Sequence, residues 1–120
     1  MADEATVNAS VAYVNGDDNI SFGKSGLTID VSGTEYIKMK QLVSTSEEVL
    51  IFGDVAKGGL GVFYNGHATA IIQIRADTAE TDLVRLEPGD VALFRIDDGA
   101  TPYVISSVEG AGLDYMIIDP

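Results

Sequence analysis

The sequence predicts an all-β fold, an antiparallel β-sandwich of jelly-roll or Greek-key type, with a small β-barrel as the alternative. Apolar and polar residues alternate with a period of two over most of its 120 residues, as in half-buried strands. Glycine, asparagine, aspartate and proline interrupt this alternation at short, regular intervals. No long 3.6-residue apolar pattern is present. We therefore expect about nine or ten short strands and no extended helix.

The expected strands are short, and residues 7–13 and 27–31 show the clearest alternation. Residues 46–48 are able to open one helical turn, and the glycine-rich residues 54–61 are expected to form a loop. The full set of expected strands is residues 7–13, 20–22, 27–31, 36–43, 49–52, 62–64, 68–76, 83–86, 91–96, 103–108 and 113–118.

Four short segments predict the turns between these strands. Residues 15–18 (NGDD) and 24–26 (KSG) carry turn-forming side chains. Asn65-Gly66 favours a type I′ hairpin between residues 62–64 and 68–76. Residues 87–90 (EPGD) place proline and glycine as a type II turn requires, and predict a hairpin or a corner.

Several expected strands are apolar on both faces, including residues 71–74, 91–96 and 115–118. A sandwich needs only one apolar face per sheet, so the second face indicates a covering partner or subunit. The alternative is a compact barrel covered by its own long loops.

The composition of the chain limits the classes of function that it could have. We expect a single domain over residues 1–120, with residues 1–6 as a flexible or docking arm. The chain has 7 basic and 19 acidic residues, for a net charge of −12, which argues against binding to nucleic acid or anionic lipid. It has no cysteine, which excludes disulfides and thiolate metal sites. The first residues lack the features of a signal peptide and no apolar run could span a membrane, so we expect a soluble protein made in the cytoplasm.

The sequence predicts no catalytic residue. His67, the one histidine, follows Asn65-Gly66 and is expected at an exposed turn, and no serine lies in a Gly-x-Ser-x-Gly motif. The carboxylate pairs at residues 17–18, 47–48 and 97–98 are adjacent in sequence, and neighbours on a strand point to opposite faces. The chain also lacks tryptophan, the usual platform for stacking sugars.

Two kinds of loop segment could bind a ligand, calcium in one case and phosphate in the other, or could simply connect strands. Asp77, Glu80 and Asp82, or residues 97–98, offer oxygen ligands for calcium, although solvated turn carboxylates are more common. Residues 57–61 (KGGLG) superficially resemble a phosphate-binding loop, but they lead into a strand and not into a helix. We therefore expect no metal, cofactor or nucleotide site.

The order of motifs from residue 53 onward resembles the small β-rich structural proteins of tailed bacteriophage virions. A glycine loop leads into a strand ending at residues 64–66 (YNG), and an acidic loop precedes residues 86–90 (LEPGD). An apolar strand with a Phe-Arg pair, residues 91–96, follows, and the chain closes on residues 113–119 (LDYMIID). Residues 29–34 and 44–48 fit the same pattern, which covers about three-quarters of the chain.

This resemblance implies a capsid decoration (cement) protein that binds the major capsid protein or other virion proteins. Such proteins commonly bind as trimers or other oligomers at junctions between capsomers, so a homo-oligomer, preferably a trimer, located in the virion is expected. A tail, neck or baseplate component remains an alternative, and so does a carbohydrate-binding β-sandwich from another functional class.

Two segments are candidate interface residues. Tyr36, Lys38 and Lys40 present neighbouring basic side chains, suited either to an acidic partner or to ordinary protection of an edge strand. Residues 2–6 are small and polar, and suit either a docking arm or a frayed terminus.

Overall fold

The computed structural model describes residues 3–31, 33–53, 55, 58–79 and 81–119. The described residues form antiparallel sheets and no helix, which confirms the all-β prediction. The chain divides into two compact units, residues 1–32 and 33–120, where the sequence analysis expected one domain.

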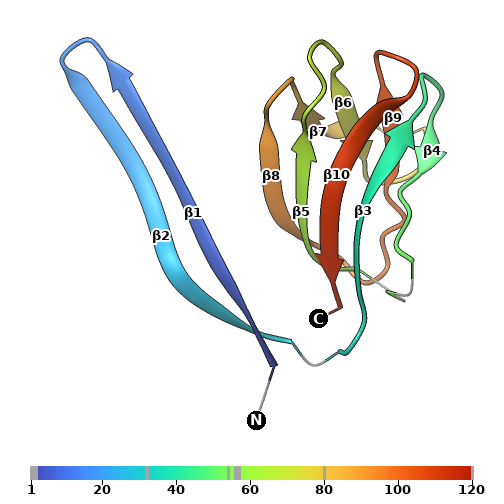
Figure 1. The fold of residues 1–120 in the computed structure, drawn as a ribbon, viewed down its shortest axis with the longest axis horizontal. Helices are drawn as coiled ribbons and strands as arrows, with labels where there is room; N and C mark the ends of the chain where they lie inside the picture. Colours follow the sequence, from blue (N-terminus) through green and yellow to red (C-terminus); the bar gives the residue numbers. More distant parts are fainter. Residues whose placement is uncertain (1–2, 32, 54, 56–57, 80, 120) are drawn as a thin grey trace. The chain divides into compact units, whose positions relative to one another are not determined.

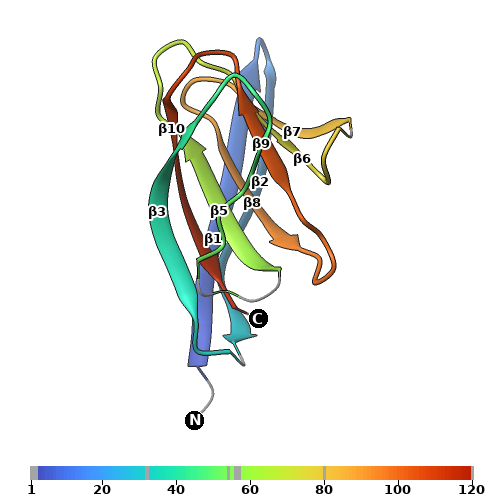
Figure 2. The same ribbon diagram turned by 90° about the vertical axis from the view of Figure 1, so that its right-hand side faces the viewer.

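The first unit is a long two-stranded hairpin. β1 (Asp3–Asn15) and β2 (Asp18–Val31) run side by side as an antiparallel ribbon (Figures 1 and 2) and pair with no other described strand. The expected turn at residues 15–18 is present, and Asn15 pairs with Asp18 across it. The expected arm residues 3–6 belong to β1, and residues 1–2 lie outside the described residues.

The turn predicted at residues 24–26 is a β-bulge within one continuous strand. The register shifts between Val7 and Ala9, and the backbone N–H of Gly26 donates to Asn8 Oδ1 at 2.7 Å. A bulge uses the same residue types as a turn, because it also breaks the regular ladder. Residues 24–26 therefore interrupt the regular strand, but they do so as a bulge and not as a turn.

The second unit is a sandwich of two four-stranded sheets. Its strands are β3 (Tyr36–Val43), β4 (Glu48–Val49), β5 (Gly59–Asn65), β6 (Ile72–Arg75), β7 (Asp82–Leu86), β8 (Val91–Ile96), β9 (Tyr103–Ser106) and β10 (Ala111–Ile118). The first sheet has the order β3-β10-β5-β8 and lies in front in Figure 1, and the second has the order β4-β9-β6-β7 and lies behind it.

The strands of this unit pair in a nested order, in which the first pairs with the last and the second with the second to last. β3 pairs with β10, β4 with β9, β5 with β8 and β6 with β7, all antiparallel. This nested pairing is the topology of a jelly roll, in which a folded-over ribbon of four strand pairs wraps into two sheets. The predicted sandwich of jelly-roll type is therefore confirmed, rather than the barrel.

The core lies between these two sheets. The largest fully buried side chains include Phe63, Ile72, Leu113 and Ile117. Phe63 stacks between Phe94 and Tyr115, with ring centroids 5.0 and 5.5 Å apart. All residues of the continuous core lie within residues 43–117.

The hairpin predicted at Asn65-Gly66 is wrong. β5 ends at Asn65 and the chain crosses to β6 in the other sheet, where β6 pairs with β7 and β9. Gly66 is not among the residues with positive φ, as a type I′ turn would require. Asn65 is instead fully buried, because its side chain bonds the backbone of this crossing.

Smaller differences concern the ends of elements. Residues 59–61, expected in a loop, begin β5. Residues 45–46 form a bend and Glu48 begins β4, where a helical turn was expected at residues 46–48. The predicted turn at residues 87–90 is confirmed as a corner between the sheets. Gly89 has φ +89°, and Asp90 N–H donates to the Glu87 carbonyl at 2.9 Å, as in a type II turn.

Candidate docking surfaces

The outer face of the first sheet is rich in exposed apolar side chains. Strand register places Val62, Leu93 and Met116 in one row across β8, β5 and β10, and Tyr64 beside Val91 in the next row. Val91 is 66% exposed, and Leu93 and Tyr64 are almost half exposed. The alternation predicted for residues 91–96 therefore holds, but the chain's described loops do not cover its second face.

Basic side chains border this apolar surface on both edge strands. Lys38 and Lys40 lie on β3, opposite Met116 and Asp114 of β10, and Arg95 lies on β8 opposite Leu60. Lys40 Nζ lies 3.9 Å from the Asp114 carboxylate, an exposed ion pair that contributes little stability. We define the outer apolar face as Tyr36, Lys38, Lys40, Leu60, Val62, Tyr64, Val91, Leu93, Arg95, Asp114, Met116 and Ile118.

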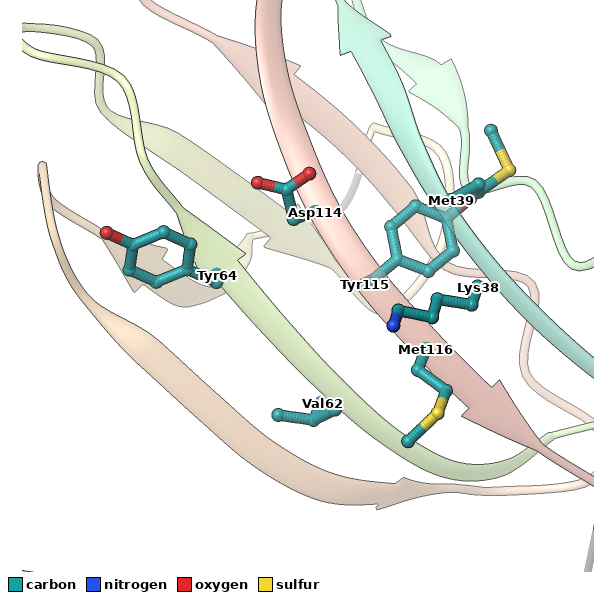
Figure 3. Close-up of a pocket in the computed structure, with 7 residues that line it drawn as sticks. All are labelled: Lys38, Met39, Val62, Tyr64, Asp114, Tyr115 and Met116. Carbon is teal, nitrogen blue, oxygen red and sulfur yellow. The ribbon is translucent and has the colours of Figure 1, made fainter.

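A hollow lies within the outer apolar face (Figure 3). Val62 and Tyr64 of β5, Asp114 and Met116 of β10, and Lys38 of β3 line it. Its lining combines apolar side chains and one aromatic ring with a carboxylate and an ammonium group. The hollow therefore suits a side chain or another amphipathic group of a partner.

The hairpin has a second exposed apolar surface. Val11 pairs with Phe22 and Tyr13 with Ile20, and directly opposite residues project from the same face of a sheet. These four side chains are between 56% and 67% exposed, and Leu27 on the same face is 45% exposed. We call these five residues the arm face. The opposite face carries small and polar pairs such as Ser10 with Gly23 and Ala12 with Ser21.

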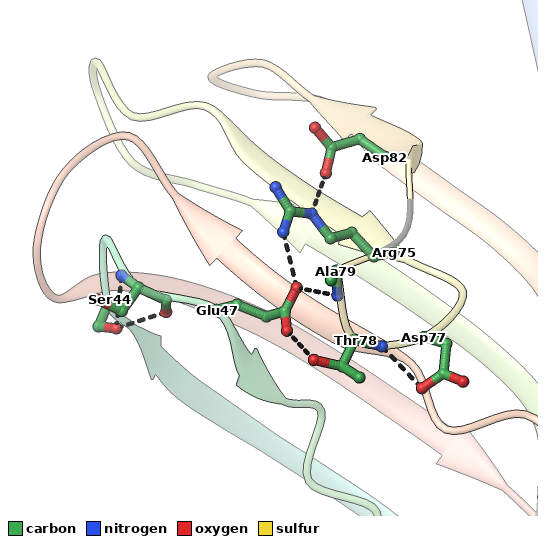
Figure 4. Close-up of polar contacts among 8 residues, drawn as sticks. Ser44, Glu47, Arg75, Asp77, Thr78, Ala79 and Asp82 are labelled. Atoms are coloured by element: carbon green, nitrogen blue, oxygen red, sulfur yellow. Dashed lines mark hydrogen bonds and ion pairs between the residues drawn. The ribbon is translucent and has the colours of Figure 1, made fainter.

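The second sheet carries a charged network (Figure 4), together with the exposed apolar side chains of Val49 and Leu83. Arg75 of β6 donates to Glu47 Oε2 at 2.7 Å and to Asp82 Oδ1 at 2.5 Å. Glu47 also accepts hydrogen bonds from the Thr78 hydroxyl and the Ala79 backbone N–H. The Thr78 hydroxyl, the Ala79 amide and the Arg75 guanidinium together hold the pKa of Glu47 below its ordinary value.

The network around Arg75 includes one of the carboxylates considered as calcium ligands. Of the proposed ligands, Asp82 is ion-paired with Arg75, Asp77 accepts from the Thr78 backbone N–H, and Glu80 lies outside the described residues. Arginine already supplies the positive charge that a cation would bring. Among the described residues, no group of three histidine, cysteine or carboxylate side chains has a geometry that could hold a metal ion.

His67 lies in the β5–β6 connection and has a structural role there. Its Nδ1 accepts hydrogen bonds from the backbone N–H groups of Thr69 and Ala70, at 3.1 and 3.0 Å. The side chain is half-buried, where an exposed turn was expected, because the connection crosses between the sheets. These two hydrogen bonds fix the imidazole ring against the backbone of the connection through Nδ1.

The carboxylate pairs do not form joint sites. Residues 17–18 lie at the hairpin turn and residues 97–98 at the turn after β8. Glu47 bonds Arg75, whereas its neighbour Glu48 accepts a 3.4 Å hydrogen bond from Gln41. These divergent partners match the expectation that adjacent carboxylates point apart.

The glycine-rich loop packs against backbone. A Cβ at Gly58 would collide with the Ile96 carbonyl, and one at Gly59 with the Ile118 carbonyl. Lys57 lies outside the described residues. These glycines allow β5 to start close beside β8 and β10, which accounts for them without a phosphate.

The sequence predicted part of the outer apolar face but not the arm face. Tyr36, Lys38 and Lys40 lie on edge strand β3, as expected for an edge. The strict alternation of residues 7–13 predicted an apolar face, but it did not show that, among the described strands, β1 and β2 pair only with each other. The feature of the sequence that could have indicated the arm face is the presence of large apolar residues in a segment that is otherwise rich in small and polar residues.

Comparisons with known protein families, with curated protein sequences and with solved structures give no match. In the described part of the chain, no helix has the length and apolar character needed to cross a membrane.

Proposed function

We propose that this chain is a structural protein of a tailed-phage particle, a capsid decoration protein that binds the major capsid protein and stabilises the shell. The observation that carries the proposal is the presence of two unpartnered apolar surfaces, the arm face and the outer apolar face, on one short chain. Exposed apolar patches of this kind mark protein–protein interfaces. The proposal assigns the chain no catalytic activity.

Three further features support this role. The side chains considered as catalytic groups, His67 and the Glu47 pair, are engaged in structural hydrogen bonds. The net charge of −12 would keep free copies soluble and apart from the packaged genome. The jelly roll occurs in viral capsid domains, among others, which is a fold-level analogy.

The proposed mechanism is linkage between binding and stability. A decoration protein makes contacts that exist only on the assembled shell, so its binding shifts the equilibrium toward the assembled state. Burial of apolar surface from water supplies the free energy that holds the assembled state together. The second sheet, with its Arg75 network, then faces solvent.

Co-sedimentation tests the proposal. The purified chain is mixed with capsids that lack their decoration protein, and the shells are pelleted. We expect saturable co-pelleting and a higher melting temperature of the shell. A chain that stays in the supernatant overturns the proposal, and so does a label seen by electron microscopy only on tails.

A carbohydrate-binding module is the second candidate, favoured by the hollow at Tyr64. There an exposed aromatic ring lines the same hollow as the carboxylate of Asp114 and the ammonium group of Lys38, a combination that suits a sugar ring. A glycan array, run with and without chelator, tests it. Binding that is lost in Tyr64→Ala supports this candidate, and an array without signal overturns it.

A further inference from the structure

We propose that the arm face of one copy packs on the outer apolar face of a second copy, so that the chain assembles with itself by exchanging arms. This inference rests on the proposed function in one respect, because both treat the arm face and the outer apolar face as interfaces. It identifies a second copy of the chain as the partner that covers them. Its test needs no capsid, so the two proposals succeed or fail separately.

The arm requires a covering partner on physical grounds. A single two-stranded hairpin is at best marginally stable in water, because one sheet of two strands cannot bury its apolar face by itself. β1 and β2 are 13 and 14 residues long, far longer than ordinary strands. Such a length, with Val11, Tyr13, Ile20 and Phe22 exposed, is costly unless that face is covered in the assembled protein.

The outer apolar face offers a matching surface. Its central rows are apolar across three strands, and pairs such as Tyr64 with Val91 lie side by side. Sheets that pack face to face bury such rows against one another. The apolar side of a two-stranded ribbon is therefore a suitable third layer over this sheet.

Charge makes a second copy the favoured occupant. Residues 1–32 contain five acidic residues and one lysine, Lys24, which lies on the same side of the hairpin as the arm face, whereas the outer apolar face contains three basic residues and one acidic residue, Asp114. Two copies with a net charge of −12 repel each other in general. The arm has an overall excess of acidic residues, and the edges of the outer apolar face carry positive charge, from Lys38 and Lys40 on β3 and Arg95 on β8. Lys24 on the arm face is opposite in charge to Asp114 of the outer apolar face.

Arm exchange also gives closed assemblies. When two copies exchange arms reciprocally, the contact is used twice in a symmetric dimer, and head-to-tail exchange closes into a ring such as a trimer. A stable interface buries about 1,200–2,000 Å² in total, and repeated use of one contact helps to reach this area. Linked copies would bind a shell multivalently and gain avidity.

Light scattering on the full-length chain after size exclusion tests the inference. Phe22→Glu places a charge on the arm face, and Leu93→Glu places one on the outer apolar face. The matched controls are Val14→Glu, at an exposed apolar residue on the opposite side of the hairpin, and Leu83→Glu, at an exposed leucine of β7. Circular dichroism verifies that each variant keeps its β structure.

We expect a dimer or closed ring for the parent chain and for both controls, and at least tenfold weaker association for Phe22→Glu and Leu93→Glu. Mixing these two variants should restore a heterodimer, because the first retains an intact outer face and the second an intact arm. A parent chain that is monomeric at about 100 µM overturns the inference. Equal disruption by the controls, or failure of the mixed variants to associate, also overturns it.

Discussion

The side-chain amide of Asn65 donates a hydrogen bond to the carbonyl of Leu86, with 2.9 Å between nitrogen and oxygen. The same nitrogen donates to the Ala70 carbonyl at 2.8 Å, and the Asn65 Oδ1 accepts from the His67 N–H at 3.1 Å. One fully buried side chain thus bonds the end of β5, the crossing to β6 and the end of β7. It joins the two sheets of the jelly roll at one end.

Asn65→Ala should therefore lower the free energy of unfolding by about 3 kcal/mol, because it leaves two buried carbonyls without a donor. Urea denaturation followed by circular dichroism measures this change. Asn19→Ala, at an exposed residue of β2, is the control and should change the value by less than about 0.5 kcal/mol. A similar small effect at Asn65 would show that the amide does not hold the sheets.

Tyr115 gives the chain a pH dependence at the alkaline end. Burial raises the pKa of Tyr115 to about 12, and its hydroxyl donates to the Ile51 carbonyl at 2.5 Å. The folded state thus holds this proton more tightly than the unfolded chain, in which the pKa of tyrosine is about 10. Its contribution to stability is complete below pH 10 and is lost as the pH rises from about 10 to about 12.

Tyr115→Phe should accordingly flatten the fall in stability above pH 10, and at neutral pH it should cost about 1 kcal/mol through the lost hydrogen bond. Denaturation curves between pH 8 and about pH 11.5 measure both effects. Tyr36→Phe, at a tyrosine that is 67% exposed, is the control and should leave the curve unchanged. Identical pH profiles for Tyr115→Phe and the parent chain would contradict the assignment.

Glu47 makes the stability of the folded chain depend on pH in the acidic range. Its pKa is lowered by hydrogen bonds from Thr78 and Ala79 and by Arg75, so the folded state favours the ionised carboxylate. That stability is present above the ordinary value of 4.5 and is lost as the pH falls through the lower pKa of the folded state. Glu47→Gln should lower the melting temperature at pH 7, and the difference from the parent chain should shrink below pH 4.5.

The matched control for Glu47 is Glu87→Gln, which removes an exposed carboxylate 3.7 Å from Arg85. Exposed ion pairs contribute little, so its melting temperature should stay close to that of the parent chain at pH 7. Thermal unfolding at several pH values measures both variants. A Glu47→Gln difference that persists unchanged at pH 3 would show that the lost stability does not come from the ionised carboxylate.

Ala79 has φ +58°, a left-handed conformation that alanine rarely adopts. Its N–H donates to Glu47 at 2.8 Å, a bond that glycine retains. Ala79→Gly should therefore raise the free energy of unfolding by about 0.5 kcal/mol, the net of relieved strain and added chain entropy. Ala76→Gly, in the same loop but without positive φ, should instead destabilise by a similar amount, so two changes of equal sign would refute this account.

The sequence predicted strands better than their partners. Period-two alternation located residues 36–43, 91–96 and 113–118, because inward and outward side chains alternate in any half-buried strand. Pairing in the jelly roll is non-local, and β3 meets β10 about 75 residues later along the chain, which no local pattern records. For the same reason Asn65-Gly66 was assigned to a local hairpin, although the chain crosses between sheets there.

The candidate surfaces were only partly predictable for a related physical reason. Strands apolar on both faces predicted a covered sheet, and Val91 and Leu93 bear out its second apolar face. The arm face depends on two facts that only the pairing shows. Val11 lies opposite Phe22, and the ribbon they form has no third strand among the described residues.

The division of the chain into two units makes a last prediction. Every residue of the continuous core lies within residues 43–117, so the jelly roll contains the buried surface it needs. A chain of residues 33–120 should unfold cooperatively in urea, with a midpoint close to that of the full chain at concentrations where self-association is absent. A synthetic peptide of residues 1–32 should show no cooperative transition, because an isolated two-stranded hairpin is marginal in water. Loss of cooperative unfolding in residues 33–120 would show that the hairpin contributes to the core.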